Sequence, residues 1–389
     1  MELDRTDALT LRLMSLLLAP RPAGAGGDPP PKDVASVVTW LGAMQAQDIG
    51  SAAWSFGARL PGWTTTDLDA AFERREAIRT WPMRGTVHYV PPRDAHWMLD
   101  LMGRRALAGA AKRREFLGLS DEVADRAVEV FATALAGGRR LTRAQCLSAL
   151  RDAGIDVAGQ LGYHLLWYAS QRGVTCFAPN IGTEQAFMLL DEWVPDPHRP
   201  DPEEALATIA LRYFRGHGPT TVADFAGWTG LPVTQCRRGV AANGTALTEV
   251  SIEGVAMVAD RALVEAYSPP RKRRADTDST SRLRRTAGGR FLVLPGFDEF
   301  MLGYKDRSLM LDAAHKQAII PGGNGVFQPT IVREGRVVGT WRRRVRRAAV
   351  EVTVSELVAL STTDRTAVEY AFRPYGDFLG LPCSVAWTS

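Results

Sequence analysis

The sequence predicts an α+β fold in which three helical units, each ending in a short hairpin, precede a β-rich C-terminal region. Two observations support this prediction. Apolar residues at helical spacing, followed by alternating strand patterns, occur three times before residue 270. Beyond Pro269 the patterns are mostly those of short strands. Because helices followed by a hairpin are typical of winged-helix units, the chain is expected to contain three of them.

The first expected unit covers residues 1–118. Thr66 is the expected N-cap of its third helix. Arg84 and His88 lie in the hairpin pattern at Thr80–Val90, and both are candidates to face a phosphate. An exposed wing arginine without a partner is an equally good interpretation of Arg84. The helices of this unit are expected at about residues 5–19, 33–44 and 67–77.

The second expected unit covers residues 119–200 and repeats the same order of elements. Thr142 is the expected N-cap of its middle helix. Short strands are expected at Gly173–Ala178 and Ala186–Leu190, around an Asn-Ile-Gly turn. The helices are expected at about residues 121–136, 142–153 and 159–172.

The third expected unit, residues 201–270, follows a proline-rich linker and contains the clearest helix-turn-helix pattern of the chain. Thr221 is expected to start one helix, Thr229–Pro232 to form the turn, and Thr234 to cap the next helix. A strand pair at Val250–Val258 would close the unit. Such motifs often read DNA, but tandem winged helices also serve as protein-interaction scaffolds.

The last region, residues 271–389, begins with a basic segment at Arg271–Gly289. It is expected to form a small β-barrel or curled sheet, with a hairpin turn at Glu334-Gly335 and a closing helix around residues 364–372. The formal net charge of +4 conceals a strong asymmetry: Arg271–Arg347 contains 18 basic and 7 acidic residues. This polarity predicts a surface that binds a polyanion. Strands are expected at Phe291–Leu294, Thr330–Arg333, Arg336–Trp341 and Val350–Val354.

Composition excludes several classes of protein. The four cysteines and six histidines are scattered, so neither a disulfide framework nor a metal site is predicted, and no cofactor is expected. No apolar run has membrane-spanning length, and Arg12 interrupts the apolar part of the first helix. These features predict a monomeric protein of the reducing cytoplasm with no membrane partner.

The segment Trp40–Asp48 carries two glutamines one residue apart, Gln45 and Gln47. Residues two apart share one side of an extended segment but point to nearly opposite sides of a helix. If both amides serve one ligand, the helix must therefore break near Ala46. Two amides can orient a water or an ester oxygen, but they cannot act as a strong base. Most such pairs are solvated surface when taken alone.

Five segments of the chain resemble the AlkZ/YcaQ family of bacterial winged-helix DNA glycosylases, in the same order as in that family. The segments are Met44–Asp48, Trp81–Val90, Tyr163–Gly173, Leu294–Ser308 and Gly325–Arg343. The resemblance implies three tandem winged helices plus a C-terminal β-barrel, arranged as a C that holds duplex DNA. It also implies a catalytic element of a glutamine, an apolar residue, and a second glutamine or an aspartate.

On this resemblance, Gln45 and Gln47 are the expected catalytic residues and hold a water near C1′ of the sugar. The expected substrate is double-stranded DNA containing alkylated purines, because an N7- or N3-alkylated purine is cationic and leaves as a neutral base. In the family, the double-glutamine form is associated with bulky N7-alkylguanine adducts and crosslinks. Such an enzyme serves either general repair or self-resistance to a genotoxic natural product.

The candidate DNA-binding residues of the C-terminal region are Lys305, Arg307, Arg342 and Arg343. For Lys305 and Arg307, pairing with Asp298, Glu299 or Asp306 inside the barrel is an equally good interpretation. The competing hypothesis for the whole chain is a non-catalytic winged-helix transcription regulator. The glutamine pair and the long segments after Leu294 favour the enzyme.

Overall fold

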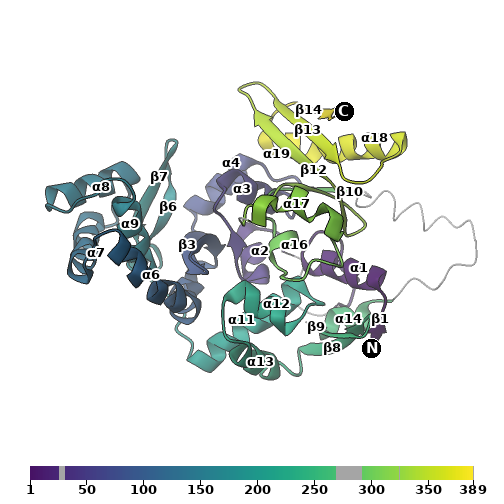
Figure 1. Ribbon diagram of the computed structural model, residues 1–389, viewed down its shortest axis with the longest axis horizontal. Helices are drawn as coiled ribbons and strands as arrows, with labels where there is room; N and C mark the ends of the chain where they lie inside the picture. The colour runs from purple at the N-terminus through teal and green to yellow at the C-terminus, as the bar shows by residue number, and fades with distance from the viewer. Residues whose placement is uncertain (26–30, 269–290, 324, 389) are drawn as a thin grey trace, which may run out of the picture.

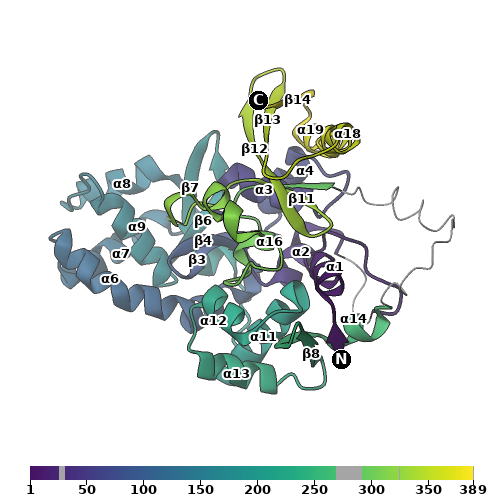
Figure 2. The ribbon, with the colours of Figure 1, turned by 45° about the vertical axis from the view of Figure 1, so that its right-hand side comes forward.

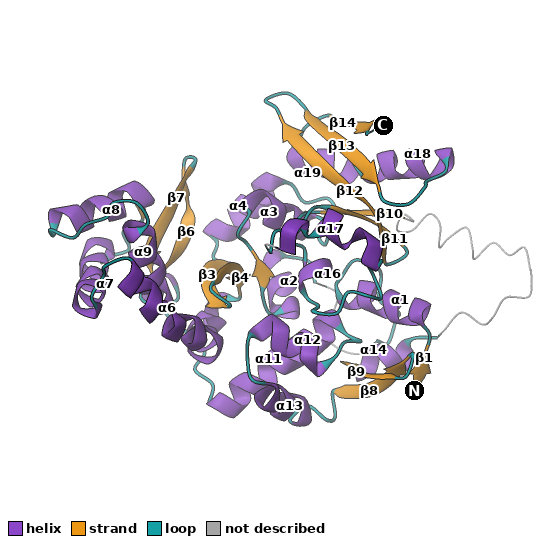
Figure 3. Cartoon of the chain, viewed as in Figure 1, coloured by secondary structure: helices purple, strands orange, loops and turns teal. Residues whose placement is uncertain are grey.

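The computed structural model describes residues 1–25, 31–268, 291–323 and 325–388. Helices of the second expected unit lie at one end of the molecule, those of the third unit lie below the centre, and a C-terminal sheet lies above it (Figure 1). Elements of the first unit lie between them. The strands of the described residues form three sheets, of three, five and six strands, with helices packed beside them (Figure 3). No helix in these four ranges is long and apolar enough to cross a membrane. The expected basic segment Arg271–Gly289 lies outside the described residues.

The first 118 residues form helices on either side of the glutamine segment. Helix α2 ends at Leu41, three residues earlier than expected, because Gly42 adopts φ 83° and no longer continues the helix. The expected third helix begins with Thr64 as its N-cap, not Thr66, and the side chains of Thr64 and Asp67 form a reciprocal capping box. The elements are β1 (Glu2–Leu3), α1 (Arg5–Ser15), α2 (Val34–Leu41), β2 (Met44–Gln45), α3 (Ile49–Gly57), α4 (Thr65–Glu73), β3 (Ile78–Met83), β4 (Thr86–Val90), a 3₁₀ turn (Pro92–Asp94), α5 (Ala95–Met98), a π-helical turn (Leu99–Gly103) and α6 (Arg104–Phe116).

The second group of helices has the expected order. Thr142 caps α8 with a capping box, as predicted. The elements are α7 (Asp121–Leu135), β5 (Leu141–Thr142), α8 (Arg143–Asp152), α9 (Leu161–Gln171), β6 (Thr175–Ile181), β7 (Glu184–Leu189) and α10 (Leu190–Trp193). Its hairpin joins the hairpin of the first group in one six-stranded sheet of order β2-β4-β3-β6-β7-β5, in which Arg79 pairs with Phe177. The two groups therefore share a sheet and are not independent units.

The third group contains the predicted helix-turn-helix. Thr221 caps α12 as expected, but Pro232 takes the N-cap position of α13, so Thr234 lies inside that helix. Strand β1 pairs in parallel with β8, which ties the N-terminus of the chain to this group. Figure 2 shows the N-terminus beside β8 and α14. The elements are α11 (Pro202–His217), α12 (Val222–Thr229), α13 (Val233–Ala241), β8 (Leu247–Ile252), β9 (Val255–Asp260) and α14 (Arg261–Ala266).

The C-terminal sheet is open, and the expected closed barrel is not found among the described residues. Its order is β10-β11-β12-β13-β14, so β10 and β14 form two separate edges. The C-terminal helices cover one face of the sheet: Trp341 of the central strand packs edge-on against Phe372 and Tyr375, with ring centroids 5.2 and 5.3 Å apart. The elements are β10 (Phe291–Leu294), α16 (Glu299–Leu302), a 3₁₀ turn (Ala313–His315), α17 (Lys316–Ile319), a second 3₁₀ turn (Pro321–Gly323), β11 (Thr330–Arg333), β12 (Arg336–Val345), β13 (Val350–Glu356), α18 (Thr362–Ala371), α19 (Arg373–Leu379) and β14 (Cys383–Trp387).

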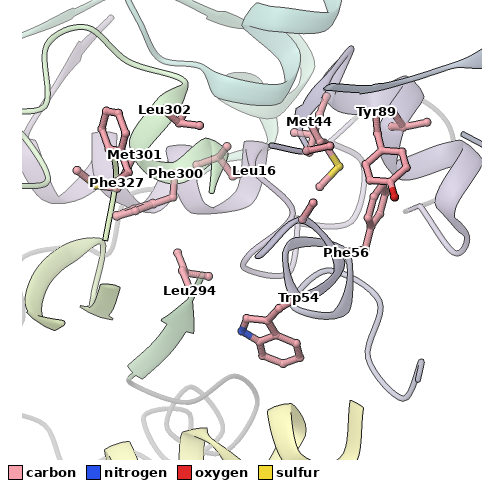
Figure 4. Close-up of a cluster of buried hydrophobic side chains, with 14 of the residues drawn as sticks. Leu16, Met44, Trp54, Phe56, Tyr89, Leu294, Phe300, Met301, Leu302 and Phe327 are labelled. Atoms are coloured by element: carbon pink, nitrogen blue, oxygen red, sulfur yellow. The ribbon is translucent and has the colours of Figure 1, made fainter. Parts of the chain in front are cut away.

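The segment from β10 to α16 packs directly against the first group of helices. Figure 4 shows Leu294 and Phe300 in one apolar cluster with Trp54 of α3. Asp298 lies at the edge of this cluster, where Arg59 contacts it through two hydrogen bonds of 2.8 and 3.0 Å. Both side chains of this ion pair are buried. Burial alone would raise the pKa of Asp298, but the charge and hydrogen bonds of Arg59 hold that pKa below its usual value.

Replacing Arg59 with Met is expected to destabilise the protein by about 3–5 kcal/mol, because it leaves the Asp298 carboxylate buried without a counter-charge. The measurement is the free energy of unfolding from urea titration. Arg74→Met is the matched control, since the Arg74–Glu76 pair is exposed on the arginine side and contributes at most about 1 kcal/mol. An equal decrease in the free energy of unfolding in the two variants would contradict this assignment. The Arg59–Asp298 pair would then not be the main polar contact between the first group of helices and the segment from β10 to α16.

Candidate active site

The glutamine segment lies between two helices, with Gln45 in an extended strand and Gln47 in the bend that follows. Gln45 belongs to the edge strand β2 and pairs with His88 of β4, and the Ala46 N–H donates to the Val87 carbonyl. Asp48 then starts α3, because its carboxylate accepts the N–H of Ser51. The break in the helix that the pair requires is therefore present, and it lies at Gly42.

The two amides face one another. Gln45 Nε2 donates to Gln47 Oε1 at 3.5 Å, the long limit for such a bond, so the contact is weak. Gln45 is buried with 8% exposure, whereas Gln47 is exposed. Gln45 Oε1 is buried and accepts no hydrogen bond from any residue that the structure describes. Buried polar atoms nearly always have a hydrogen-bond partner. An unpaired buried acceptor is therefore a candidate for binding a substrate or a water.

A buried carboxylate lies directly behind Gln45. The Gln45 N–H points to Glu299 Oε1 at 3.4 Å, while Glu299 Oε2 accepts from Trp228 Nε1 at 2.9 Å and lies 3.2 Å from His217 Nε2. His217 Nδ1 faces the Tyr213 carbonyl at 3.1 Å, so both ring nitrogens face acceptors.

Glu299 therefore forms a second buried ion pair next to the first. Burial alone would raise the pKa of Glu299, but the hydrogen bond and charge of His217 hold it below its usual value. Sequence reasoning considered Glu299 only as a partner for Lys305 or Arg307 and did not consider His217. The feature of the sequence that could have indicated this buried pair is the presence of two adjacent acids, Asp298 and Glu299, within an apolar segment.

His88 does not reach the surface, contrary to the expectation that it faces a phosphate. It is fully buried: Nδ1–H donates to the Thr86 carbonyl at 2.9 Å, and Nε2 accepts from the Arg84 guanidinium at 3.3 Å. Burial, followed by the charge of Arg84, lowers the pKa of His88 from 6.5 to about 4. His88 is therefore neutral near pH 7, and it positions Arg84.

Arg84 occupies the tip of the hairpin between β3 and β4. Both Arg84 and Gly85 have positive φ, at 54° and 70°, as a type I′ turn requires. The Arg84 side chain is exposed, although the surrounding protein removes enough water to lower its pKa. The nearby Glu299 carboxylate opposes that shift. An arginine held in this way keeps its charge and remains accessible to an anion.

Lys305 and Arg307 lie on the loop after α16 and differ in their surroundings. Lys305 is exposed, and its backbone N–H is held by Asp224 at 2.8 Å. Arg307 is half-buried: it donates to the Met301 carbonyl at 2.7 Å and lies 4.9 Å from the centre of the Phe327 ring. Lys305 is thus free to contact a phosphate, whereas Arg307 already supports the loop.

Pairing of these two cations with Asp298 or Glu299 is not observed, because those carboxylates are taken by Arg59 and His217. Asp306, the third acid of that alternative, has its pKa lowered by hydrogen bonds from Ser308 and, to a smaller extent, by the charge of Arg307.

Arg342 and Arg343 are neighbours on β12 and therefore point to opposite faces of the sheet. Arg342 is exposed. Arg343 is half-buried and forms an ion pair of 3.0 Å with Asp48, 295 positions away in the sequence. Burial alone would raise the pKa of Asp48, but Ser51 and Arg343 lower it. The structure thus brings Arg343 next to the glutamine segment and leaves Arg342 on the other face of β12.

The sequence model of the DNA glycosylase AlkZ-like family matches residues 38–378, a range that contains the glutamine pair and β12. The chain belongs to this family. Members are DNA glycosylases, hydrolases that act on N-glycosyl bonds, so the transcription-regulator alternative is not favoured.

Comparisons of the sequence and of the structure both find similarity to AlkZ of Streptomyces sahachiroi. A protein named interstrand DNA cross-link repair glycosylase is 27% identical over 310 residues, which cover 73% of this chain and 79% of the relative. The solved structure of Streptomyces sahachiroi DNA glycosylase AlkZ has the same fold, with a TM-score of 0.74. It is 24% identical, and the match covers 99% of this chain and 100% of the other.

The buried His88 makes the stability of this AlkZ-like protein depend on pH. Between about pH 4 and pH 6.5 the unfolded chain binds a proton at His88 that the folded protein does not, so stability falls as the pH drops through this window. The expected loss at pH 4 is roughly 3 kcal/mol. His88→Asn should flatten this dependence, measured as Tm from pH 4 to 7, with His315→Asn as the matched control. If Tm falls with decreasing pH as steeply in His88→Asn as in wild type, burial of neutral His88 is not the cause of the pH dependence.

Proposed function

We propose that this protein is a monofunctional DNA glycosylase that hydrolyses the N-glycosidic bond of N7-alkylguanine in duplex DNA, including bulky adducts and interstrand crosslinks. The observation that supports it most directly is the geometry of Gln45 and Gln47. Two neutral amides face one another, and one of their oxygens has no partner among the described residues. The name of the 27% identical relative, a cross-link repair glycosylase, agrees with the proposed substrate.

The chemistry of the pair matches an activated leaving group. An alkylated purine is already cationic and departs as a neutral base, so the enzyme must mainly place a water and stabilise positive charge on the sugar. Gln45 and Gln47 supply dipoles for both tasks but no proton. Glu299 positions Gln45 through its backbone N–H, and its carboxylate adds negative potential behind the pair.

Four exposed or half-buried cations are proposed to hold the DNA phosphates: Arg84, Lys305, Arg342 and Arg343. They come from the first hairpin, the loop after α16 and the two faces of β12, so Arg342 is proposed to contact a different part of the duplex from Arg343. Arg307 contributes indirectly, by supporting the loop that carries Lys305. Phosphate contacts of this kind bind DNA of any sequence.

Water is the proposed nucleophile. Of the 47 basic residues only five are lysines, and none is close to the glutamine pair in sequence, the nearest being Lys32. A Schiff base between a lysine and the sugar is therefore not part of the proposal. The expected product is an intact strand with an abasic site.

The same activity suits protection of an organism that makes a DNA-alkylating natural product. We propose self-resistance as the physiological role, with general repair as the alternative. The genes beside this one decide between them: a biosynthetic cluster for an alkylating compound supports self-resistance, and its absence supports general repair.

Gln45→Ala and Gln47→Ala are each expected to reduce excision of N7-methylguanine about 100-fold or more, with duplex affinity within about twofold of wild type, because both residues act in the transition state. The measurements are single-turnover excision and duplex binding by fluorescence anisotropy.

Arg342→Ala is the matched control, with the opposite pattern. It should weaken binding to duplexes of any sequence. The slope of log affinity against log salt concentration should become shallower by about 1, the change expected for the loss of one phosphate contact, while excision at saturating DNA stays near wild type. Full excision by both glutamine variants would overturn the proposed mechanism and restore the regulator alternative.

A further inference from the structure

A cavity of about 470 Å³ lies between α3, α4 and the shared six-stranded sheet. The first turn of α3 forms one rim, through Ile49 and Gly50, and the hairpin of β6 and β7 forms the opposite rim, through Asn180 and Gly182. Arg79 of β3 lies on its floor. No step of the proposed glycosidic cleavage uses this cavity.

Arg79 is the unusual residue of the cavity. It is buried with 6% exposure, and no hydrogen bond or ion pair of its guanidinium is seen in the described part of the chain, but its nitrogens are not enclosed by protein and therefore face the open space of the cavity. Its cross-strand partners are Tyr89 on one side and Phe177 on the other, and its Cζ lies 5.9 and 4.6 Å from their ring centres. A guanidinium carries five N–H donors, so Arg79 can donate to an acceptor that enters the cavity.

The other walls are aromatic. Phe72 of α4 stacks on Tyr89 with ring centroids 4.6 Å apart and an interplanar angle of 9°, and Trp193 also lines the space. Of the two acids that line it, Glu73 is bound by Arg140 at 2.9 Å, which leaves Asp69. The Asp69 side chain is exposed. The aromatic walls beside the donors of Arg79 suit an oxygen acceptor carried on a flat ring.

The cavity begins close to the glutamine pair. Gly50 on the rim is three residues from Gln47, which is at most about 11 Å of fully extended chain. Arg343 lies over the same rim, because a Cβ added to Gly50 would meet its guanidinium at 2.6 Å. Arg79 shares a sheet face with Met44 and Tyr89, opposite to Gln45. A group bound in this cavity while the sugar lies at Gln45 must therefore be connected to the sugar or its base by a linker.

We propose that this cavity binds a planar aromatic ring carrying an oxygen acceptor, supplied by the alkyl part of a bulky N7-guanine adduct. Arg79 donates to the acceptor, and Tyr89, Phe177 and Phe72 contact the ring. This inference rests on the proposed function and narrows its substrate class to adducts that carry an aryl group on a flexible linker. A nucleobase displaced from the duplex has the same chemistry and is the second possible source of the ring.

Two variants test the proposal. Arg79→Met removes the donors and retains much of the volume, and Ala53→Leu fills the cavity from α3 without changing charge. The substrates are two duplexes, one with N7-methylguanine and one with guanine joined at N7 through a flexible linker to a naphthyl ketone. Both variants are expected to lower kcat/KM for the naphthyl adduct about tenfold. Their kcat/KM for N7-methylguanine is expected to stay within about twofold of wild type.

The other outcomes distinguish the sources of the ring. An equal decrease in kcat/KM on both lesions would assign the cavity to a displaced nucleobase and overturn the adduct proposal. No loss on either lesion, in variants whose Tm matches wild type, would overturn the site altogether.

A binding measurement without DNA separates this inference from the proposed function. Isothermal titration with indole-3-carboxamide should show saturable binding to the wild-type protein and at least tenfold weaker binding to Ala53→Leu. If the wild-type protein excises neither lesion, the proposed function fails, while this difference in binding would still support the cavity. Absence of saturable binding to the wild-type protein would count against the cavity whatever the excision rates are.

Discussion

The arrangement of this protein depends on two adjacent buried carboxylates, Asp298 and Glu299. Asp298 is bound by Arg59 of the first group of helices, and Glu299 lies against His217 of the third group. All four side chains are almost fully buried, so each charge requires its partner. One short segment of the C-terminal region thereby fixes two distant parts of the chain. Because Gln45 donates its N–H to Glu299, the position of the glutamine pair follows from the same constraint.

The edge strand β2 separates two environments. On one side, Gln45 faces the Glu299–His217 pair, with Arg84 held by the neutral His88. The opposite face of the same sheet carries Arg79 between aromatic rings. The ion pair between Arg343 and Asp48 links the C-terminal sheet to the point where β2 passes into α3. A site for chemistry and a site for recognition can therefore lie close together without sharing side chains.

Local signals in the sequence predicted much of the fold. The helix starts at Thr142 and Thr221 were correctly placed, because a cap depends on residues within one helical turn. The end of α2 was misplaced because Gly42 ends a helix whose apolar pattern continues to Met44. Barrel closure was also wrong, since strand patterns do not show whether an edge is paired or covered by helices.

Long-range contacts were the part that the sequence did not reveal. His88 alternates correctly for a wing strand, but its burial depends on β2 and on the segment containing Glu299. The Arg343–Asp48 pair joins residues 295 positions apart, which no local pattern shows. Arg79 was not singled out, because its aromatic neighbours come from two other strands. The pair Gln45 and Gln47 was predicted because five segments of the chain resemble a glycosylase family, since two amides one residue apart are mostly solvated surface when taken alone.

The central claim is that this site depends on a leaving group activated by alkylation, since Gln45 and Gln47 offer dipoles and no proton. The most direct measurement is the single-turnover rate of abasic-site formation on a panel of duplexes that each contain one lesion. The account predicts that N7-alkylguanine is released at least about 100-fold faster than uracil or hypoxanthine, because the uncharged bases need protonation that the amides cannot supply. Release of uracil at a rate comparable to that of N7-alkylguanine would contradict it.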